Sequence, residues 1–140
     1  MLAASDGVLR NMTKKVIILQ DFKQLAVWQK AYQLTLSIYQ TTQAFPKEEA
    51  YGLTSQMRRS SASIPTNIAE GCGRDSNPEF VRFLAIAMGS ASELECQLML
   101  SRDLNMMDSG VYEVINRDLI EVKRMLTGLI HKIKNTYTKR

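Results

Sequence analysis

The sequence predicts an all-α protein, an antiparallel up-down four-helix bundle with a proline-bent second helix. Apolar residues recur every three or four positions in long stretches, as on the buried face of an amphipathic helix, and no stretch shows the alternation of a strand. Short polar segments join these stretches, which favours antiparallel packing of consecutive helices. A chain of 140 residues suits one domain with a real core. We expect residues 1–20 to form a flexible or extended leader and residues 21–137 to form the bundle.

The first helix is predicted to begin at Asp21 and to end at Phe45. Asp21 is a good N-cap, and Gln24 follows three residues later as in a capping box. Phe45 precedes a proline, and a residue before proline avoids the helical region. Three aromatic residues at helical spacing are predicted to lie in the core or in a subunit interface: Trp28, Tyr32 and Tyr39.

The second helix is predicted to run from residue 47 or 48 to residue 70. Pro65 donates no N–H and clashes with the carbonyl of Ser61, so the helix is expected to bend or break there. Small side chains at residues 60–63 allow another backbone to approach closely. Gly71 and Gly73 are predicted to end the helix in the left-handed conformation.

The third helix has the clearest predicted start, with Ser76 as N-cap, Pro78 in the first turn and Glu79 three residues after the cap. A second small patch at residues 89–92 is predicted to face the small run of the second helix. After a turn at residues 105–110, the fourth helix is predicted to begin near Ser109. Apolar residues in both helices keep the alternating spacing of four and three that a bundle seam requires.

The charge is mildly basic and unevenly distributed. Lys plus Arg is 18 and Asp plus Glu is 14, which gives +4 and a pI near 9.2. The basic excess lies on the first helix and at the end of the fourth, which can be neighbours. The candidate nucleic-acid contacts are Lys23, Lys30, Arg58, Arg59, Arg74, Lys132 and Lys134.

Structural explanations exist for the same residues. Lysines near a helix C-terminus also compensate the helix dipole. Arg58 and Arg59 either grip phosphate, which suits their forked guanidinium groups, or form ion pairs with an acidic residue of the bundle or of a neighbouring subunit.

The sequence offers little for catalysis or for a metal site. His131 is the only histidine, and Cys72 and Cys96 form no metal-ligand spacing, so we expect no metal, no cofactor and reduced cysteines in the cytoplasm. No set of nucleophile and base is present. An enzyme would require a pocket at the Pro65 bend that holds Glu70 with a raised pKa, and we expect no enzyme. No export signal or stretch of about 20 apolar residues indicates a membrane.

Several motifs resemble one protein family over about residues 21 to 135. They are Phe22–Ala31 (FKQLAVWQKA), Phe45–Glu49 (FPKEE), Gln56–Ser60 (QMRRS) and above all Ser63–Gly71 (SIPTNIAEG). The chain resembles the four-helix bundle proteins encoded in intervening sequences of bacterial 23S ribosomal RNA genes. That family is similar to the accessory variability determinant of diversity-generating retroelements.

The resemblance implies a small helical subunit that assembles as a pentameric ring and binds nucleic acid. In the retroelement relatives the partner is a reverse transcriptase together with RNA. The family has no established catalytic residues. The sequence therefore predicts a ring-forming RNA- or nucleic-acid-binding protein, or alternatively a protein scaffold that recruits a partner such as a reverse transcriptase.

Overall fold

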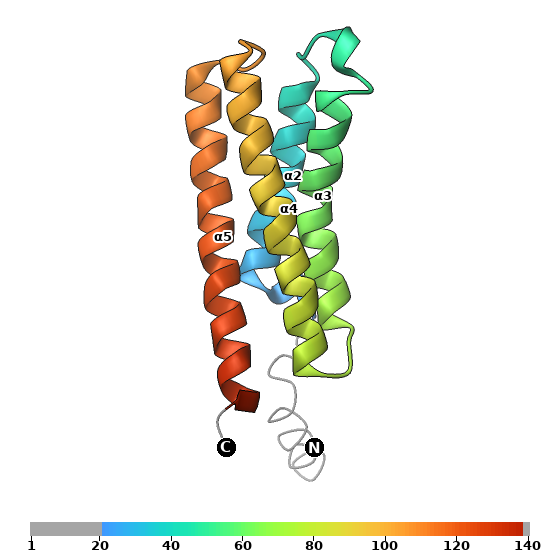
Figure 1. The fold of residues 1–140 in the computed structure, drawn as a ribbon, viewed down its shortest axis with the longest axis vertical. Coiled ribbons are helices and arrows are strands. Elements are labelled where there is room, and N and C mark those ends of the chain that lie inside the picture. The colour runs from blue at the N-terminus through green and yellow to red at the C-terminus, as the bar shows by residue number, and fades with distance from the viewer. Residues whose placement is uncertain (1–20, 139–140) are drawn as a thin grey trace.

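The computed structural model describes residues 21–138, and every regular element within that range is helical. The predicted all-α class with four α-helices is confirmed (Figure 1). The predicted leader at residues 1–20 lies outside the described residues. The elements in chain order are η1 (Phe22–Gln24), α2 (Ala26–Thr42), η2 (Lys47–Glu49), α3 (Leu53–Cys72), α4 (Asn77–Asp103) and α5 (Ser109–Thr138).

The four helices lie side by side, and each one contacts two others in the cyclic order α2, α3, α4, α5. Figure 1 shows the α2–α3 and α4–α5 connections at one end of the bundle, which we call the α4–α5 end. The start of α2, the α3–α4 turn and the end of α5 lie toward the opposite end, which we call the α3–α4 end. The α2–α5 contact is the least extensive of the four helix contacts.

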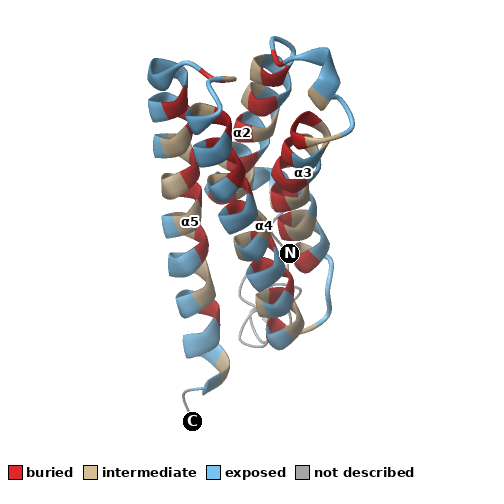
Figure 2. Ribbon diagram, turned by 45° about the horizontal axis from the view of Figure 1, so that its top comes forward, coloured by how far each residue is buried: buried red, intermediate tan, exposed pale blue. Residues whose placement is uncertain are grey.

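The apolar stripes predicted from the spacing meet along the bundle axis (Figure 2). Large side chains from all four helices lose all contact with solvent: Ile38, Met57, Ile64, Ile68, Phe80, Leu84, Leu94, Leu98, Leu119, Leu126 and Ile133. Each fully buried side chain of this size contributes about 1.5–3 kcal/mol by leaving water, and this burial is the main stabilising term.

Two helix starts show how far capping signals predict boundaries. Asp21 accepts a hydrogen bond from the Lys23 backbone N–H at 3.0 Å, which lowers the pKa of its carboxyl group, but the turn that it caps is the short η1. Leu25 is extended (φ −74°, ψ 124°), so α2 begins only at Ala26. Ser76 is the N-cap of α4 as predicted, because its hydroxyl oxygen accepts the Glu79 N–H at 3.3 Å.

Pro65 lies inside α3 and does not end it. A proline leaves the carbonyl four residues earlier without its helical donor, and here that carbonyl belongs to Ser61, which is fully buried. The Thr35 hydroxyl of α2 lies 2.9 Å from the Ser61 carbonyl oxygen and 3.0 Å from the carbonyl oxygen of Ala31. The neighbouring helix therefore supplies the donor that Pro65 lacks. The predicted break is wrong, and the bend stays a prediction.

The predicted left-handed glycine stops are wrong. Gly73 has a φ of −83°, and no described glycine has a positive φ. Gly71 lies within the last turn of α3, where a Cβ atom would come 2.9 Å from Cδ1 of Phe80 and 3.0 Å from Cβ of Phe83. Gly71 is thus required for the close approach of α4. The left-handed position is instead Asn105, with a φ of 60°, directly after α4.

The small patches of α3 and α4 face each other, as predicted. The hydroxyl oxygens of Ser63 and Ser90 are 2.8 Å apart. Farther along the same contact, the buried Ser60 hydroxyl donates to Oε1 of Gln97 at 2.7 Å. Because these buried and partly buried hydroxyl groups have partners, small side chains bring the two helices together without leaving polar groups unpaired.

Among the described helices, α4 alone is long and apolar enough to cross a membrane by length and composition, with a mean hydropathy of 1.2 over its most apolar window. A core helix meets the same criterion when both of its faces are apolar. One face of α4 packs on α3 and α5. Its outer face also carries apolar residues, among them Ile86, Met99 and Leu100.

We expect Thr35→Val to lower the free energy of unfolding by about 1–3 kcal/mol, because the buried Ser61 carbonyl loses its donor. The same substitution in the Pro65→Ala background should cost less, because alanine restores the N–H that proline lacks. Chemical denaturation of the four proteins of this cycle measures the coupling. Thr127→Val is the matched control, since Thr127 bonds only to its own helix at an exposed position. Equal costs in both backgrounds would contradict the compensation.

We expect Gly71→Ala to destabilise the protein by about 1–3 kcal/mol, because the added methyl group overpacks the contact with α4. Gly128→Ala, where a Cβ would meet nothing within 4 Å, should be neutral or stabilising by up to about 1 kcal/mol. Thermal melts of both variants test the difference, and equal melting temperatures would show that α4 adjusts freely at this contact.

Candidate nucleic-acid interface

Four of the predicted contact residues lie toward the α3–α4 end. Lys23 belongs to η1, just before α2, and Arg74 lies in the turn between α3 and α4. Lys132 and Lys134 lie in the last two turns of α5. These segments are far apart in the chain but share one end of the bundle (Figure 1). The first and last helices are in contact, as α2 and α5, and Lys30 pairs with Asp118 across this contact. That the basic end of α5 lies beside α2 stays a prediction.

The cations at this end differ in how far they are neutralised. Lys23 forms an ion pair with Asp21 at 3.3 Å, and Arg74 forms one with Glu70 at 3.5 Å. Nearby, Arg82 donates to Glu79 at 2.9 Å, and this bond lowers the pKa of the Glu79 carboxyl group and raises the pKa of Arg82. These pairs hold little net charge.

The last two turns of α5 carry cations that form no ion pair within residues 21–138. Its residues from Val122 to Thr138 include no acid and four cations, namely Lys123, Arg124, Lys132 and Lys134. Lys123 reaches Glu95 of α4 at 2.6 Å, and Arg124 pairs with Glu121 at 2.8 Å. The side chains of Lys132 and Lys134 are exposed and make no ion pair with any residue of the range 21–138. The uncompensated charge of this end therefore comes mainly from these two lysines.

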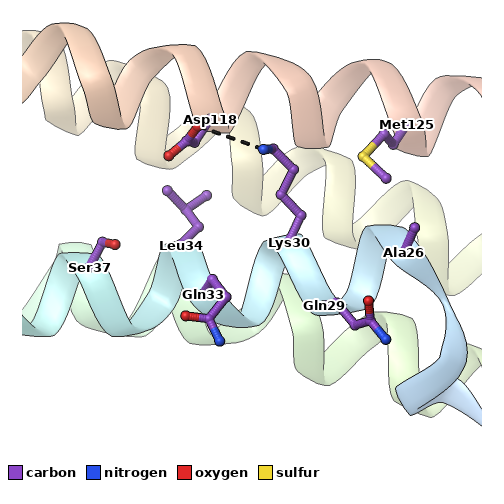
Figure 3. A pocket seen from close by; sticks show the side chains of 8 residues that line it. All are labelled: Ala26, Gln29, Lys30, Gln33, Leu34, Ser37, Asp118 and Met125. Carbon is purple, nitrogen blue, oxygen red and sulfur yellow. Dashed lines mark ion pairs between the residues drawn. The ribbon is translucent and has the colours of Figure 1, made fainter.

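Lys30 lies farther along the bundle, in a groove of about 410 Å³ between α2 and α5. Its ammonium group lies 3.7 Å from the carboxylate of Asp118 on the opposite helix (Figure 3). Leu34 and Met125 give the groove apolar walls, and Gln29 and Gln33 add amides. Because Asp118 faces Lys30, this groove presents little positive charge to a polyanion.

Arg58 and Arg59 lie toward the other end, in the second turn of α3. Nε of Arg58 donates to the Thr42 hydroxyl oxygen at 2.9 Å, and Nη2 donates to the Tyr39 carbonyl at 3.3 Å. Arg59 is exposed. Neither arginine forms the predicted ion pair with an acid of its own bundle within residues 21–138. The seven predicted contacts therefore do not form one surface.

Of the three aromatic residues predicted for the core or a subunit interface, Trp28 packs against the core, whereas the core location is wrong for Tyr32 and Tyr39. Tyr32 and Tyr39 are 44% and 42% exposed, and Trp28 is partly buried. Trp28 stacks on Tyr32 with ring centroids 4.9 Å apart, and Phe22 meets Trp28 edge-on at 5.1 Å. The rings of Phe22, Trp28 and Tyr32 line an apolar groove of about 350 Å³ beside Pro65. A role in a subunit interface stays a prediction.

Glu70 does not occupy the position that the enzyme alternative requires. It is exposed, pairs with Arg74 and does not line the groove beside Pro65. Within residues 21–138, no three His, Cys, Asp or Glu residues gather as a metal site would require.

The family model for 23S rRNA-intervening sequence proteins matches residues 23–128. The chain belongs to this family. The match includes the region around Pro65 and both halves of the α3–α4 contact. A search of curated proteins gives no match.

A solved structure supports the same assignment. The crystal structure of a protein of unknown function from the S23 ribosomal protein family of Bacteroides thetaiotaomicron VPI-5482 is similar to this chain with a TM-score of 0.69 and 28% identity. The similarity covers 75% of this chain and 98% of the other. This member of the intervening-sequence family therefore shares its helical fold with a solved relative.

Proposed function

We propose that this protein is a non-enzymatic, cytoplasmic homo-oligomer that binds RNA through the α3–α4 end of its bundle. The observation that carries the proposal is the pair Lys132 and Lys134, exposed and unpaired within residues 21–138, on a stretch of α5 without acids. Such lysines neutralise phosphates and release counterions. They have no fixed geometry toward bases, so we expect binding through the backbone with little reading of sequence.

The outer face of α4 supports assembly. Ile86, Met99 and Leu100 are 41%, 44% and 47% exposed there. Gly89 and Ser92 are also exposed between them, which allows a second helix to come close. Glu93, two turns from both Ile86 and Leu100, is exposed on the same face, so the surface is mixed. Exposed apolar residues gathered on one face commonly mark protein–protein interfaces. We propose that this face contacts another copy of the chain.

Assembly and RNA binding support each other. In a cyclic ring every copy of the α3–α4 end lies at the same height along the axis. A ring of five, the state that the family resemblance implies, would bring five copies of Lys132 and Lys134 together. The small net charge of +4 per chain would then become a concentrated basic surface.

The groove of Phe22, Trp28, Tyr32 and Pro65 favours a second candidate function. Partly exposed aromatic residues along an apolar groove are typical of protein-binding surfaces, and the residues of this groove belong to η1, α2 and α3 rather than to the basic α5. A scaffold that recruits a partner such as a reverse transcriptase would use this groove. A complex with that partner that persists after nuclease treatment would distinguish this function from RNA binding.

We expect Lys132→Glu/Lys134→Glu to weaken binding of a structured RNA at least about tenfold and to reduce the slope of log K against log salt by about two, one per phosphate contact. Fluorescence anisotropy of labelled RNA at several salt concentrations gives both quantities. The control is Lys47→Glu/Arg117→Glu, which makes the same change in net charge elsewhere. Equal losses of RNA affinity in both double variants would contradict binding through Lys132 and Lys134.

We expect Ile86→Glu/Met99→Glu to reduce the oligomer to a smaller species, because it places charge in an apolar contact. Multi-angle light scattering measures the mass, and circular dichroism checks that the helices remain. The control is Tyr51→Glu, at a fully exposed apolar residue away from α4. An unchanged mass in the double variant would contradict assembly through the outer face of α4.

A further inference from the structure

A second polar site lies where the end of α2 meets the start of α3, at the α4–α5 end of the bundle. It is a depression of about 480 Å³ whose lining residues are Tyr39, Ala50, Thr54, Ser55, Arg58 and Arg59. Neither arginine is involved in the basic surface at the end of α5. Neither arginine forms an ion pair with a carboxylate of residues 21–138.

Arg58 is held rigidly, but only by neutral groups. Its guanidinium donates to the Thr42 hydroxyl and the Tyr39 carbonyl and lies over the Tyr39 ring, 4.8 Å from the centroid. No carboxylate of residues 21–138 lies within 4.0 Å of Arg58 or Arg59. Four other arginines of this range do have such partners: Arg74, Arg82, Arg102 and Arg124. The positive charge of Arg58 is therefore positioned but not compensated.

Two hydroxyl groups complete the site. Thr54 is 8% exposed, and its Oγ1 atom is buried without a hydrogen-bond partner among residues 21–138. A buried polar group without a partner is costly and calls for an explanation. Ser55 adds a partly buried hydroxyl one residue later. Both belong to the first turn of α3, where the dipole favours an anion and the first N–H groups lack a helical acceptor. The Glu49 carboxylate already accepts the Leu53 N–H there at 3.2 Å, which leaves the N–H groups of Thr54 and Ser55 for a ligand.

We propose that Arg58, Arg59, Thr54 and Ser55 form a binding site for a phosphate group. A guanidinium fork matches phosphate oxygens, and hydroxyl and N–H donors at a helix start suit the remaining oxygens. Arg58 is preorganised by its neutral contacts, and Arg59 is free to close over the ligand. The phosphate is either a monoester of a small molecule or a phosphodiester of a nucleic-acid backbone.

The site stands independently of RNA binding at the end of α5. If Lys132 and Lys134 prove unimportant, phosphate can still bind at the start of α3. If the phosphate site fails, the basic end of α5 is unaffected. The two surfaces lie toward opposite ends of the bundle, so variants of one leave the other intact.

The test is a titration of the ¹⁵N-labelled full chain with inorganic phosphate at constant ionic strength, followed by ¹H–¹⁵N correlation spectra. We expect saturable shifts of the Thr54 and Ser55 amides and of the Arg58 Nε–H. Arg59→Gln should weaken the apparent affinity by about tenfold, as expected for the loss of a charged hydrogen bond. Arg117→Gln, at another arginine without an ion pair in the described range, is the matched control and should leave the affinity unchanged.

Arg58 is not the first choice for substitution, because its removal also releases the end of α2. Ser55→Ala serves as the second variant and should weaken the affinity less than Arg59→Gln. Linear, non-saturating shifts, or equal affinities of Arg59→Gln and Arg117→Gln, would overturn the proposal. A nucleoside monophosphate and a short oligoribonucleotide are then added in separate arms. Tighter binding of the first at these amides indicates a small-molecule ligand, and tighter binding of the second indicates a nucleic-acid backbone.

Discussion

The bundle depends on how α3 accommodates a proline in its interior. Pro65 removes the donor for a buried carbonyl, and leaving that carbonyl unpaired would cost about 1–3 kcal/mol. Thr35 of α2 meets this requirement at 2.9 Å, which fixes α2 against the middle of α3. On the other side of α3, the Ser63–Ser90 and Ser60–Gln97 bonds fix α4 at close range. One helix thereby sets the position of its two neighbours, and α5 closes the bundle.

The parts of the fold that follow local rules could be predicted. Spacing of apolar residues identified the four helices, and Ser76 with Pro78 marked the start of α4. The errors concern neighbours that are distant in sequence. Gly71 looked like a left-handed stop, but Phe80 and Phe83 of the next helix explain it. Pro65 looked like a break, and only the position of Thr35 shows why the helix continues.

The candidate site likewise has features that the sequence predicts and features that depend on contacts between distant residues. The basic character of the last helix was visible in the sequence, because α5 has no acid after Glu121. The sequence does not show which cations lack an ion-pair partner. Lys30, for example, pairs with Asp118, which lies on another helix and is distant in the sequence. The aromatic residues of the first helix have the spacing of core residues. The apolar residues of α2 cover more of its circumference than the bundle buries, so Tyr32 and Tyr39 stay at the surface. Two surfaces with uncompensated cations emerge, one at each end of the bundle.

We propose that an oligomer of this chain binds RNA by electrostatic contact at one end. The decisive measurement is the light-scattering mass after size exclusion, with and without a structured RNA and at low and high salt. We expect an oligomer, five copies by family resemblance, that gains the mass of the RNA at low salt and releases it at high salt. A monomer, or an oligomer whose mass is indifferent to RNA at low salt, would contradict it.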